Sequence, residues 1–313
     1  MKNGFFFRAL TFIFFVLPIG VYSNNLNMIL SSSVSGKYII GIDTKSNDIY
    51  ILDIEKQIVL KQLPKSFYPL QIWLCDTSFV YANEIKDSIE FGVYNLKADF
   101  FFKMNVISKK QFQEIDDADF LTVPNYILHD SLPFLIFANN NKVYKYFPFK
   151  NEKQMLIDLK GKIEKINNIA IDNRGKTLLL AGRNNHIGYL YSINLDDYKL
   201  TIIDKGKVFS GDGTYVYFTK NESKCVYYKY VTNTEESKIV QIILYDLNKS
   251  SSYILKTYNN MLPTSVIDVP IEKKLFINFL NTSGTIDITA SNHILFDVAT
   301  GLINSFAIEE INY

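Results

Sequence analysis

Cysteine and histidine are scarce in this sequence of 313 residues. The two cysteines, Cys75 and Cys225, are too few for a disulfide framework, and neither has a cysteine or histidine at metal-ligand spacing. The three histidines are His129, His186 and His293, which lie too far apart in sequence to form a local metal motif or a local acid–base pair. We therefore predict no metal site and assign no catalytic residue.

Familiar catalytic and cofactor motifs are also missing. The sequence contains no Gly-x-Ser-x-Gly elbow and no phosphate-binding loop, and we predict no cofactor. The densest acidic cluster is Glu114, Asp116, Asp117 and Asp119. It lacks the Gly and the later Glu of an EF-hand loop, so we interpret it as a solvated loop and not as a calcium site.

Arginine occurs three times, at Arg8, Arg174 and Arg183, so nearly all the positive charge is lysine. The full chain carries 33 basic and 32 acidic residues and is therefore close to neutral. A neutral chain has no long-range field that would attract nucleic acid, and lysine lacks the planar fork that grips phosphate. We expect no nucleic-acid partner.

The N-terminal residues have the pattern of a secretory signal peptide. Lys2 and Arg8 precede an uncharged apolar stretch, and Val21-Tyr22-Ser23 offers a cleavage site after Ser23. The apolar stretch is short for a membrane span and contains Pro18, so cleavage is favoured over an uncleaved anchor. We predict a signal peptide at 1–23, a periplasmic or secreted mature chain, and no stable membrane insertion after cleavage.

Short apolar runs end at similar punctuation points along the whole chain. The points recur about every 40 to 55 residues, which is the spacing of β-propeller blades. In the first repeat, four apolar stretches are separated by turn-forming groups, which predicts four strands. The six marker residues are Asp53, Asn95, Pro148, Asn194, Asp246 and Asp297.

The apolar runs do not alternate with polar residues, so both faces of each sheet must be covered. Blades stacked between neighbours meet this condition, whereas a two-layer sandwich exposes one face of each sheet. We predict an all-β fold: a single β-propeller domain at 24–313, with six blades, or seven as the alternative, and four antiparallel strands per blade. Cys75 and Cys225 would then lie on opposite sides of the ring, so we favour two buried, unbridged cysteines.

Two repeats resemble the WD40-like and YVTN-repeat β-propeller superfamily. The fourth repeat runs from Ile169 through a turn at Asp172-Asn173-Arg174-Gly175-Lys176 to a strand ending at Asn194. In the fifth repeat, Tyr230-Val231-Thr232-Asn233 precedes a strand that ends in Tyr245-Asp246, where WD40 repeats place Trp-Asp. The resemblance implies a secreted propeller. The single Trp73 argues against a quinoprotein propeller, which repeats a Trp motif in each blade.

Two segments permit more than one structure. The range 150–167 fits a helical stripe, but Gly161 favours an outer strand followed by the first strand of the next blade. The fifth repeat has room for an extra strand before Val240, because 214–219 and 225–231 both have strand patterns.

The sequence predicts a non-enzymatic scaffold that binds another extracytoplasmic protein, a surface component or a ligand through its loops, as a monomer. The alternative is a hydrolase or lactonase-like enzyme with its site in the central channel. The contact face would be formed by the loops that join second and third strands and by the loops that link blades. The candidate binding residues are Lys45, Asn140, Arg183 and His186.

Overall fold

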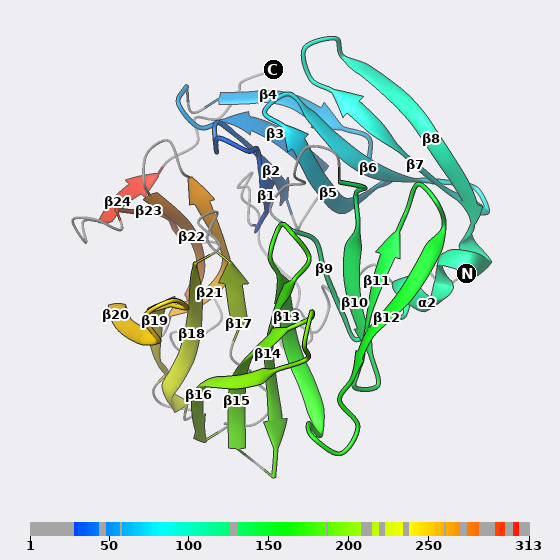
Figure 1. Ribbon diagram of the computed structural model, residues 1–313. Coiled ribbons are helices and arrows are strands. Elements are labelled where there is room, and N and C mark those ends of the chain that lie inside the picture. Colours follow the sequence, from blue (N-terminus) through cyan, green and yellow to red (C-terminus); the bar gives the residue numbers. More distant parts are fainter. Residues whose placement is uncertain are drawn as a thin grey trace.

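The computed structural model shows a ring of antiparallel sheets (Figure 1). Each sheet contains four strands that are neighbours in sequence and in space, as the four-strand repeat predicts. The described residues are 28–43, 48–56, 58–124, 131–185, 187–207, 215–218, 223–233, 238–259, 261–269, 274–281, 292–297 and 303–306. The predicted signal peptide at 1–23 lies outside them.

The strands follow one another around the ring, blade by blade. Blade 1 holds β1 (Met28–Ser32), β2 (Tyr38–Asp43), β3 (Asp48–Asp53) and β4 (Ile58–Leu63). Blade 2 holds β5 (Phe67–Cys75), β6 (Ser78–Ile85), β7 (Ser88–Asn95) and β8 (Phe100–Ser108). Blade 3 holds β9 (Phe120–Thr122), β10 (Leu135–Asn139), β11 (Lys142–Phe147) and β12 (Glu152–Asp158).

Blade 4 holds β13 (Lys165–Ile171), β14 (Thr177–Asn184), β15 (Ile187–Asn194) and β16 (Leu200–Lys207). Blade 5 holds β17 (Tyr215–Phe218), β18 (Lys224–Asn233), β19 (Lys238–Asp246) and β20 (Ser251–Asn259). A last sheet holds β21 (Met261–Val269), β22 (Lys274–Asn281), β23 (Asn292–Asp297) and β24 (Ile303–Phe306). The first strand of each sheet lies near the axis and the fourth lies at the rim (Figure 1).

The predicted blade count needs a correction. Side-chain clusters join blade 1 to blade 2, blades 2, 3 and 4 to one another, and blade 4 to blade 5. The strands β21–β24 form a four-stranded sheet between β19 and β1, and the structure describes it in its backbone only. The prediction of six blades, with seven as the alternative, is therefore wrong: the structure supports five blades of four antiparallel strands, β1–β20, beside the sheet β21–β24, which is described by its backbone alone.

The middle strands are buried on both faces, which explains their unbroken apolar runs. In β14, Leu178 and Leu180 pack in the cluster shared with blade 3. Leu179 and Ala181, which alternate with them, pack in the cluster shared with blade 5. All four side chains are fully buried. The alternating faces of one strand thus fill two different blade interfaces, as the sequence predicts.

Four of the six marker residues close a turn at the end of a third strand. Asp53 Oδ1 accepts a hydrogen bond from Lys56 N at 3.1 Å. Asn95 Oδ1 accepts the equivalent bond from Ala98 N at 2.9 Å. Asn and Asp are interchangeable here because each needs only one side-chain oxygen to hold the turn. Related bonds are made by Asn194 and Asp246.

The two ambiguous segments are resolved as strands. The range 150–167 contributes β12 and β13, so the helix alternative is wrong. The fifth repeat forms a regular four-stranded blade, β17–β20, without an extra strand. Both cysteines are free, but Cys75 is exposed and not buried as predicted, whereas Cys225 is buried.

The acidic cluster is predicted as a solvated loop, and this is wrong for Glu114 and Asp116, which belong to helix α2 (Lys109–Asp116). Asp117 and Asp119 follow the helix and are exposed, as predicted. Ser108 caps the helix in a capping box with Gln111, and Phe112 and Ile115 are buried beneath it. Asp116 is half-buried. These two apolar residues, three apart, fix the helix on the cluster between blades 2 and 3.

Candidate binding surfaces

The innermost strands carry few charged residues. Among β1, β5, β9, β13, β17 and β21, the described sequence contains Lys165 and Asp268 as its charged residues. Within the described ranges, no three His, Cys, Asp or Glu side chains are close enough together to hold a metal ion. The convergence of acidic, basic and histidine groups that a channel enzyme requires is therefore not found in this part of the chain.

Two of the four predicted binding residues are described, and they lie at one end of the ring. Lys45 and His186 lie outside the described residues. Asn140 is in the β10–β11 hairpin at a φ of 48°, and its backbone N donates to Asp119 Oδ2 at 3.0 Å. Arg183 lies near the end of β14, where its Nε is buried without a hydrogen bond.

Hydrogen bonds connect the hairpins that carry these two residues to the segment that links blades 3 and 4. Asn141 Nδ2 donates to Ile163 O at 2.9 Å and to Glu164 O at 3.3 Å. Glu164 N in turn donates to Arg183 O at 3.0 Å. The polar groups of this end are thus used to tie neighbouring blades together. The binding role that the sequence suggests for Asn140 and Arg183 stays a prediction.

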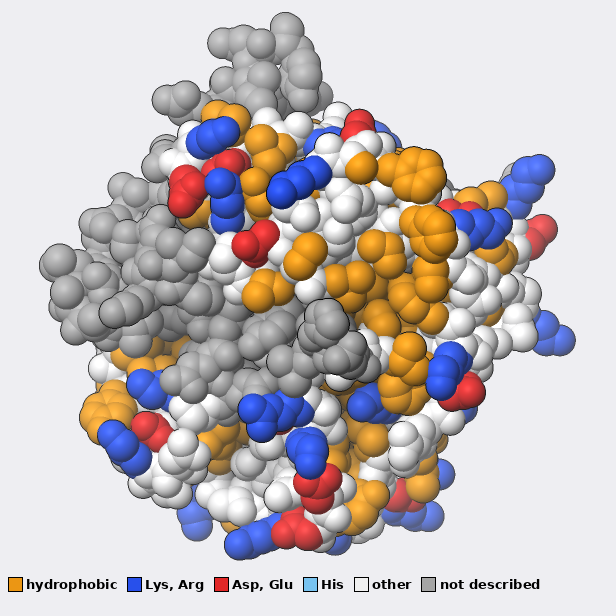
Figure 2. Space-filling model, turned by 45° about the horizontal axis from the view of Figure 1, so that its top comes forward, with side chains coloured by type: hydrophobic (Ala, Val, Ile, Leu, Met, Phe, Trp, Pro, Cys, Tyr) orange, Lys and Arg blue, Asp and Glu red, His pale blue; other side chains and the backbone are white. Residues whose placement is uncertain are grey.

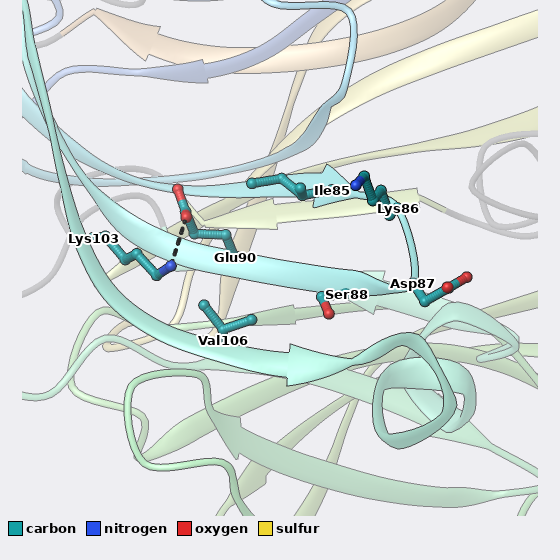
Figure 3. A pocket seen from close by; sticks show the side chains of 7 residues that line it. All are labelled: Ile85, Lys86, Asp87, Ser88, Glu90, Lys103 and Val106. Atoms are coloured by element: carbon teal, nitrogen blue, oxygen red, sulfur yellow. Dashed lines mark ion pairs between the residues drawn. The ribbon is translucent and has the colours of Figure 1, made fainter.

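A cavity of about 350 Å³ opens at the same end of blade 2 (Figure 3). It lies over the β6–β7 hairpin, which joins a second to a third strand as the hairpins of Asn140 and Arg183 do. It is shallow, with one side formed by β8. The residues that line it are Ile85, Lys86, Asp87, Ser88, Glu90, Lys103 and Val106.

Glu90 is the most strongly held side chain of this cavity. Its Oε1 accepts a hydrogen bond from the Tyr81 hydroxyl at 2.9 Å, and its Oε2 pairs with Lys103 Nζ at 3.4 Å. Its side chain is 15% exposed. Burial, followed by the bond to Glu90, raises the pKa of Tyr81, so the phenol remains a proton donor.

The absence of a side chain at Gly92 leaves room for the Tyr81 hydroxyl and for strand β8. A Cβ at Gly92 would lie 2.4 Å from Phe102 O and 2.6 Å from the Tyr81 hydroxyl oxygen. Both distances are too short for real atoms, so any side chain here would push β8 away from β7 or displace Tyr81.

Strand β8 and the adjacent hairpin expose large apolar side chains. The fractions exposed are 59% for Phe100, 56% for Phe102, 47% for Met104, 42% for Val106 and 44% for Ile85. We call these five residues the blade 2 edge. Hydrophobic side chains gather in the upper right of the face in Figure 2, the side on which Figure 1 places blade 2. Large contiguous apolar patches on a protein surface often mark interaction sites.

A β-bulge divides the blade 2 edge between two faces. Val93 pairs with Phe102 and Gly92 with Lys103, but Phe91 pairs with Asn105, so Met104 is the extra residue. The alternation of side chains between the two faces of β8 is therefore reversed after Met104. Phe100 and Phe102 lie on one face of β8, while Val106 lies on the other, beside the cavity.

Sequence reasoning missed the blade 2 edge, although a signal was present. The letters Phe-Phe-Phe-Lys-Met-Asn-Val occupy 100–106, the place of the fourth strand of the second repeat. A fourth strand lies at the rim, so its apolar residues cannot all be needed for the core. The repeat phasing and the apolar run together would have indicated this surface.

No family profile and no curated protein matches the sequence. Solved structures do resemble the chain. The putative TolB of Agrobacterium tumefaciens has a TM-score of 0.53 at 13% identity, over 83% of this chain and 88% of that one. TolB of Acinetobacter baumannii has a TM-score of 0.50 at 11% identity, over 91% of this chain and 69% of that one.

The tricorn protease also matches, with a TM-score of 0.50 at 9% identity, over 93% of this chain but 36% of the protease. At such identities the likeness shows the fold alone. The chain is a β-propeller. Among the described residues, no helix is long and apolar enough to cross a membrane.

Proposed function

We propose that this β-propeller is a non-enzymatic binding scaffold that works outside the cytoplasm and holds a partner protein at the blade 2 edge. The observation that carries the proposal is the exposure of Phe100, Phe102 and Met104 on an outer strand. The core does not require these side chains, because the inner and middle strands already fill the blade interfaces. Leaving them in water is unfavourable unless a partner covers them.

The surroundings of the blade 2 edge support a rigid contact surface. Phe101, between the two exposed phenylalanines, packs on Tyr94 with ring centroids 4.4 Å apart and on Phe67 at 5.3 Å. On the other side of the bulge, Asn105 Nδ2 donates to Pro148 O of blade 3 at 2.8 Å. The strand is thus anchored to the inner strands of its own blade and to blade 3, so a partner would bind it without the entropic cost of ordering it.

The proposed location depends on the N-terminal pattern. Lys2, Arg8 and the apolar stretch that ends at 19 have the order of a signal peptide. Fractionation of cells that express the full chain, with sequencing of the N-terminus of the purified protein, tests this part. We expect a mature chain that begins at Asn24 and lies outside the cytoplasm. A cytoplasmic protein that retains Met1 would contradict it.

Photo-crosslinking tests the proposed contact surface. A benzoylphenylalanine is placed at Phe102, and a matched control at Met155, which is 54% exposed on the outer strand of blade 3. We expect a discrete crosslinked protein from position 102 and none from position 155 in cells that naturally make this protein. Equal crosslinking at both positions, or none at position 102, would overturn the proposal.

A further inference from the structure

Among the described residues, no strand pairs with the outer edge of β8, and side chains close part of that edge. Within the described sheet, β8 pairs with β7 and with no other strand. In its second half, Val106 N donates to Asn105 Oδ1 at 2.9 Å, and Ser108 N donates to Gln111 Oε1 at 3.0 Å. These bonds occupy amides that a further strand would need. The first half, Phe100–Lys103, has no such cap among the described residues.

The two faces of this first half differ in chemistry. Phe100 and Phe102 present rings on one face. On the other face, Phe101 is partly buried and the side chain of Lys103 is 60% exposed. A strand added along this edge would alternate between the same two faces. Apolar residues on it would meet the rings. Acidic residues would lie beside Lys103, which remains largely exposed although it also pairs with Glu90.

The charge around the edge favours an acidic partner. Three acids near the edge are already paired with lysines of the chain: Asp99 with Lys61, Glu84 with Lys109 and Glu90 with Lys103. Asp87, which lines the cavity, forms no ion pair among the described residues. Asp99 also accepts a hydrogen bond from the Tyr94 hydroxyl at 2.8 Å.

Two exposed lysines remain at the two ends of β8. They are Lys97, in the turn before the strand, and Lys110, in α2. Neither forms an ion pair among the described residues. An acidic segment lying along β8 would be attracted at both ends.

We propose that the partner at the blade 2 edge is an extended segment of another protein, with alternating apolar and acidic residues, which adds as a fifth strand along Phe100–Lys103. This inference rests on the proposed function and specifies its partner. A second copy of the chain is disfavoured, because its own open segment, Phe-Phe-Phe-Lys at 100–103, carries no acidic residue to meet Lys103. A lipid surface could cover the rings, but it offers no row of backbone groups to match an open strand edge.

Synthetic peptides test the partner's chemistry on the full chain by fluorescence anisotropy. The probe is a labelled ten-residue peptide in which Glu alternates with Val and Leu. One control replaces each Glu by Lys, and another places Pro at two central positions, which removes backbone donors. We expect the Glu peptide to bind at least about tenfold more tightly than either control, a difference of about 1.4 kcal/mol.

Variants locate the binding on the protein. Phe102→Ser should weaken binding of the Glu peptide about tenfold. The double variant Lys97→Glu, Lys110→Glu should do so to a similar degree and more strongly at low salt. Met155→Ser should leave binding unchanged. Circular dichroism and thermal melting of each variant show whether it is folded, and a folded Phe102→Ser protein that binds like the parent would overturn the inference.

Other occupants give distinct results. Tight binding to phosphatidylglycerol vesicles without binding of the Glu peptide would replace the inference by a lipid surface. Self-association that Phe102→Ser abolishes would replace it by a second copy. If position 102 crosslinks a partner in cells while the Glu peptide fails to bind, the inference is wrong and the proposed function stands. If position 102 captures no partner, the proposed function itself fails.

Discussion

Strands β8 and β12 hold the same place in neighbouring blades, yet they show different chemistry to water. Both are fourth strands at the rim of the ring. β8 exposes Phe100, Phe102, Met104 and Val106, whereas the exposed residues of β12 are Glu152, Lys153, Gln154, Asp158 and one apolar residue, Met155. The fold therefore does not dictate the chemistry of a fourth strand. An apolar fourth strand points to a role outside the core.

Helix α2 joins these two strands. Ser108, the last residue of β8, is its N-cap, and Glu114 on the helix pairs with Lys153 of β12 at 2.5 Å. The helix also buries Phe112 in the cluster that blades 2 and 3 share. The position of the blade 2 edge relative to blade 3 thus depends on α2.

Phe112→Ala gives the largest expected effect, because it removes the anchor between the two strands. Phe112 is 1% exposed and lies 5.8 Å from the ring of Phe91. We expect the free energy of unfolding to fall by about 3–5 kcal/mol, measured by urea denaturation. Phe102→Ala, a phenylalanine in the exposed part of β8, is the matched control and should cost much less. Equal losses would contradict the separation of core from edge.

Gly92→Ala breaks the pairing that holds β8 in place. Its methyl group would clash with Phe102 O and with Tyr81, so we expect a loss of about 1–3 kcal/mol. Gly206 on β16, the fourth strand of blade 4, has no atom within 4 Å of its Cβ position. Gly206→Ala should be neutral or slightly stabilising. A tolerated Gly92→Ala would show that Tyr81 and β8 are free to move.

Asp116 makes the α2 region sensitive to pH. Burial, followed by the charges of Asp117 and Glu84, raises the pKa of Asp116 to about 6, although Lys109 opposes this. Its pKa is thus raised above the unfolded value of 3.8. A raised carboxyl pKa favours the folded state below the unfolded pKa, and this contribution is lost as the pH rises through the folded pKa.

We therefore expect stability to decline between about pH 4 and pH 6 by about 1 kcal/mol, after discounting for the half-exposed position of the group. Asp116→Asn should remove this part of the pH dependence and stabilise the protein at pH 7. Thermal melting of both proteins across this range is the measurement. Asp117→Asn, at the exposed C-cap, is the control with a smaller effect. An unchanged pH profile in Asp116→Asn would refute the assignment.

The smallest effect on stability is expected when the exposed surface of β8 is made polar like that of β12. Phe100→Lys with Phe102→Gln gives β8 a surface similar to that of β12. We expect a change below about 1 kcal/mol in the free energy of unfolding, because both rings are more than half exposed. A large loss of stability would mean that the rings serve the fold and not a partner.

Much of the fold is predictable from the sequence because blade packing leaves a local signature. Runs such as Leu178–Ala181 show burial on both faces, and turns closed by Asp53 or Asn95 show where third strands end. Substitution of Asn for Asp does not disturb this pattern, since the turn needs one oxygen acceptor. The packed-blade count is less accessible, because it depends on the curvature of the ring and not on any one repeat.

Helix α2 and the contacts of the hairpin residues are harder to predict from the sequence, for different reasons. The charges at Glu114 and Asp116 suggested a loop, although Ser108 and Gln111 have capping-box spacing. The sequence predicts contacts at hairpin residues such as Asn140 and Arg183 because polar loops often bind partners. In the structure, Asn140 N donates to Asp119 Oδ2 and Arg183 O accepts from Glu164 N, so these backbone groups serve the fold, and the binding role of the two side chains stays a prediction.

Hydrogen exchange of the full chain, with and without the Glu peptide, tests the central claim most directly. Mass spectrometry compares a fragment that covers Phe100–Lys103 with one that covers Glu152–Asp158 of β12. The account predicts slower exchange in the β8 fragment on addition of the peptide and no change in the β12 fragment. Equal protection of both fragments, or protection confined to β12, would contradict it.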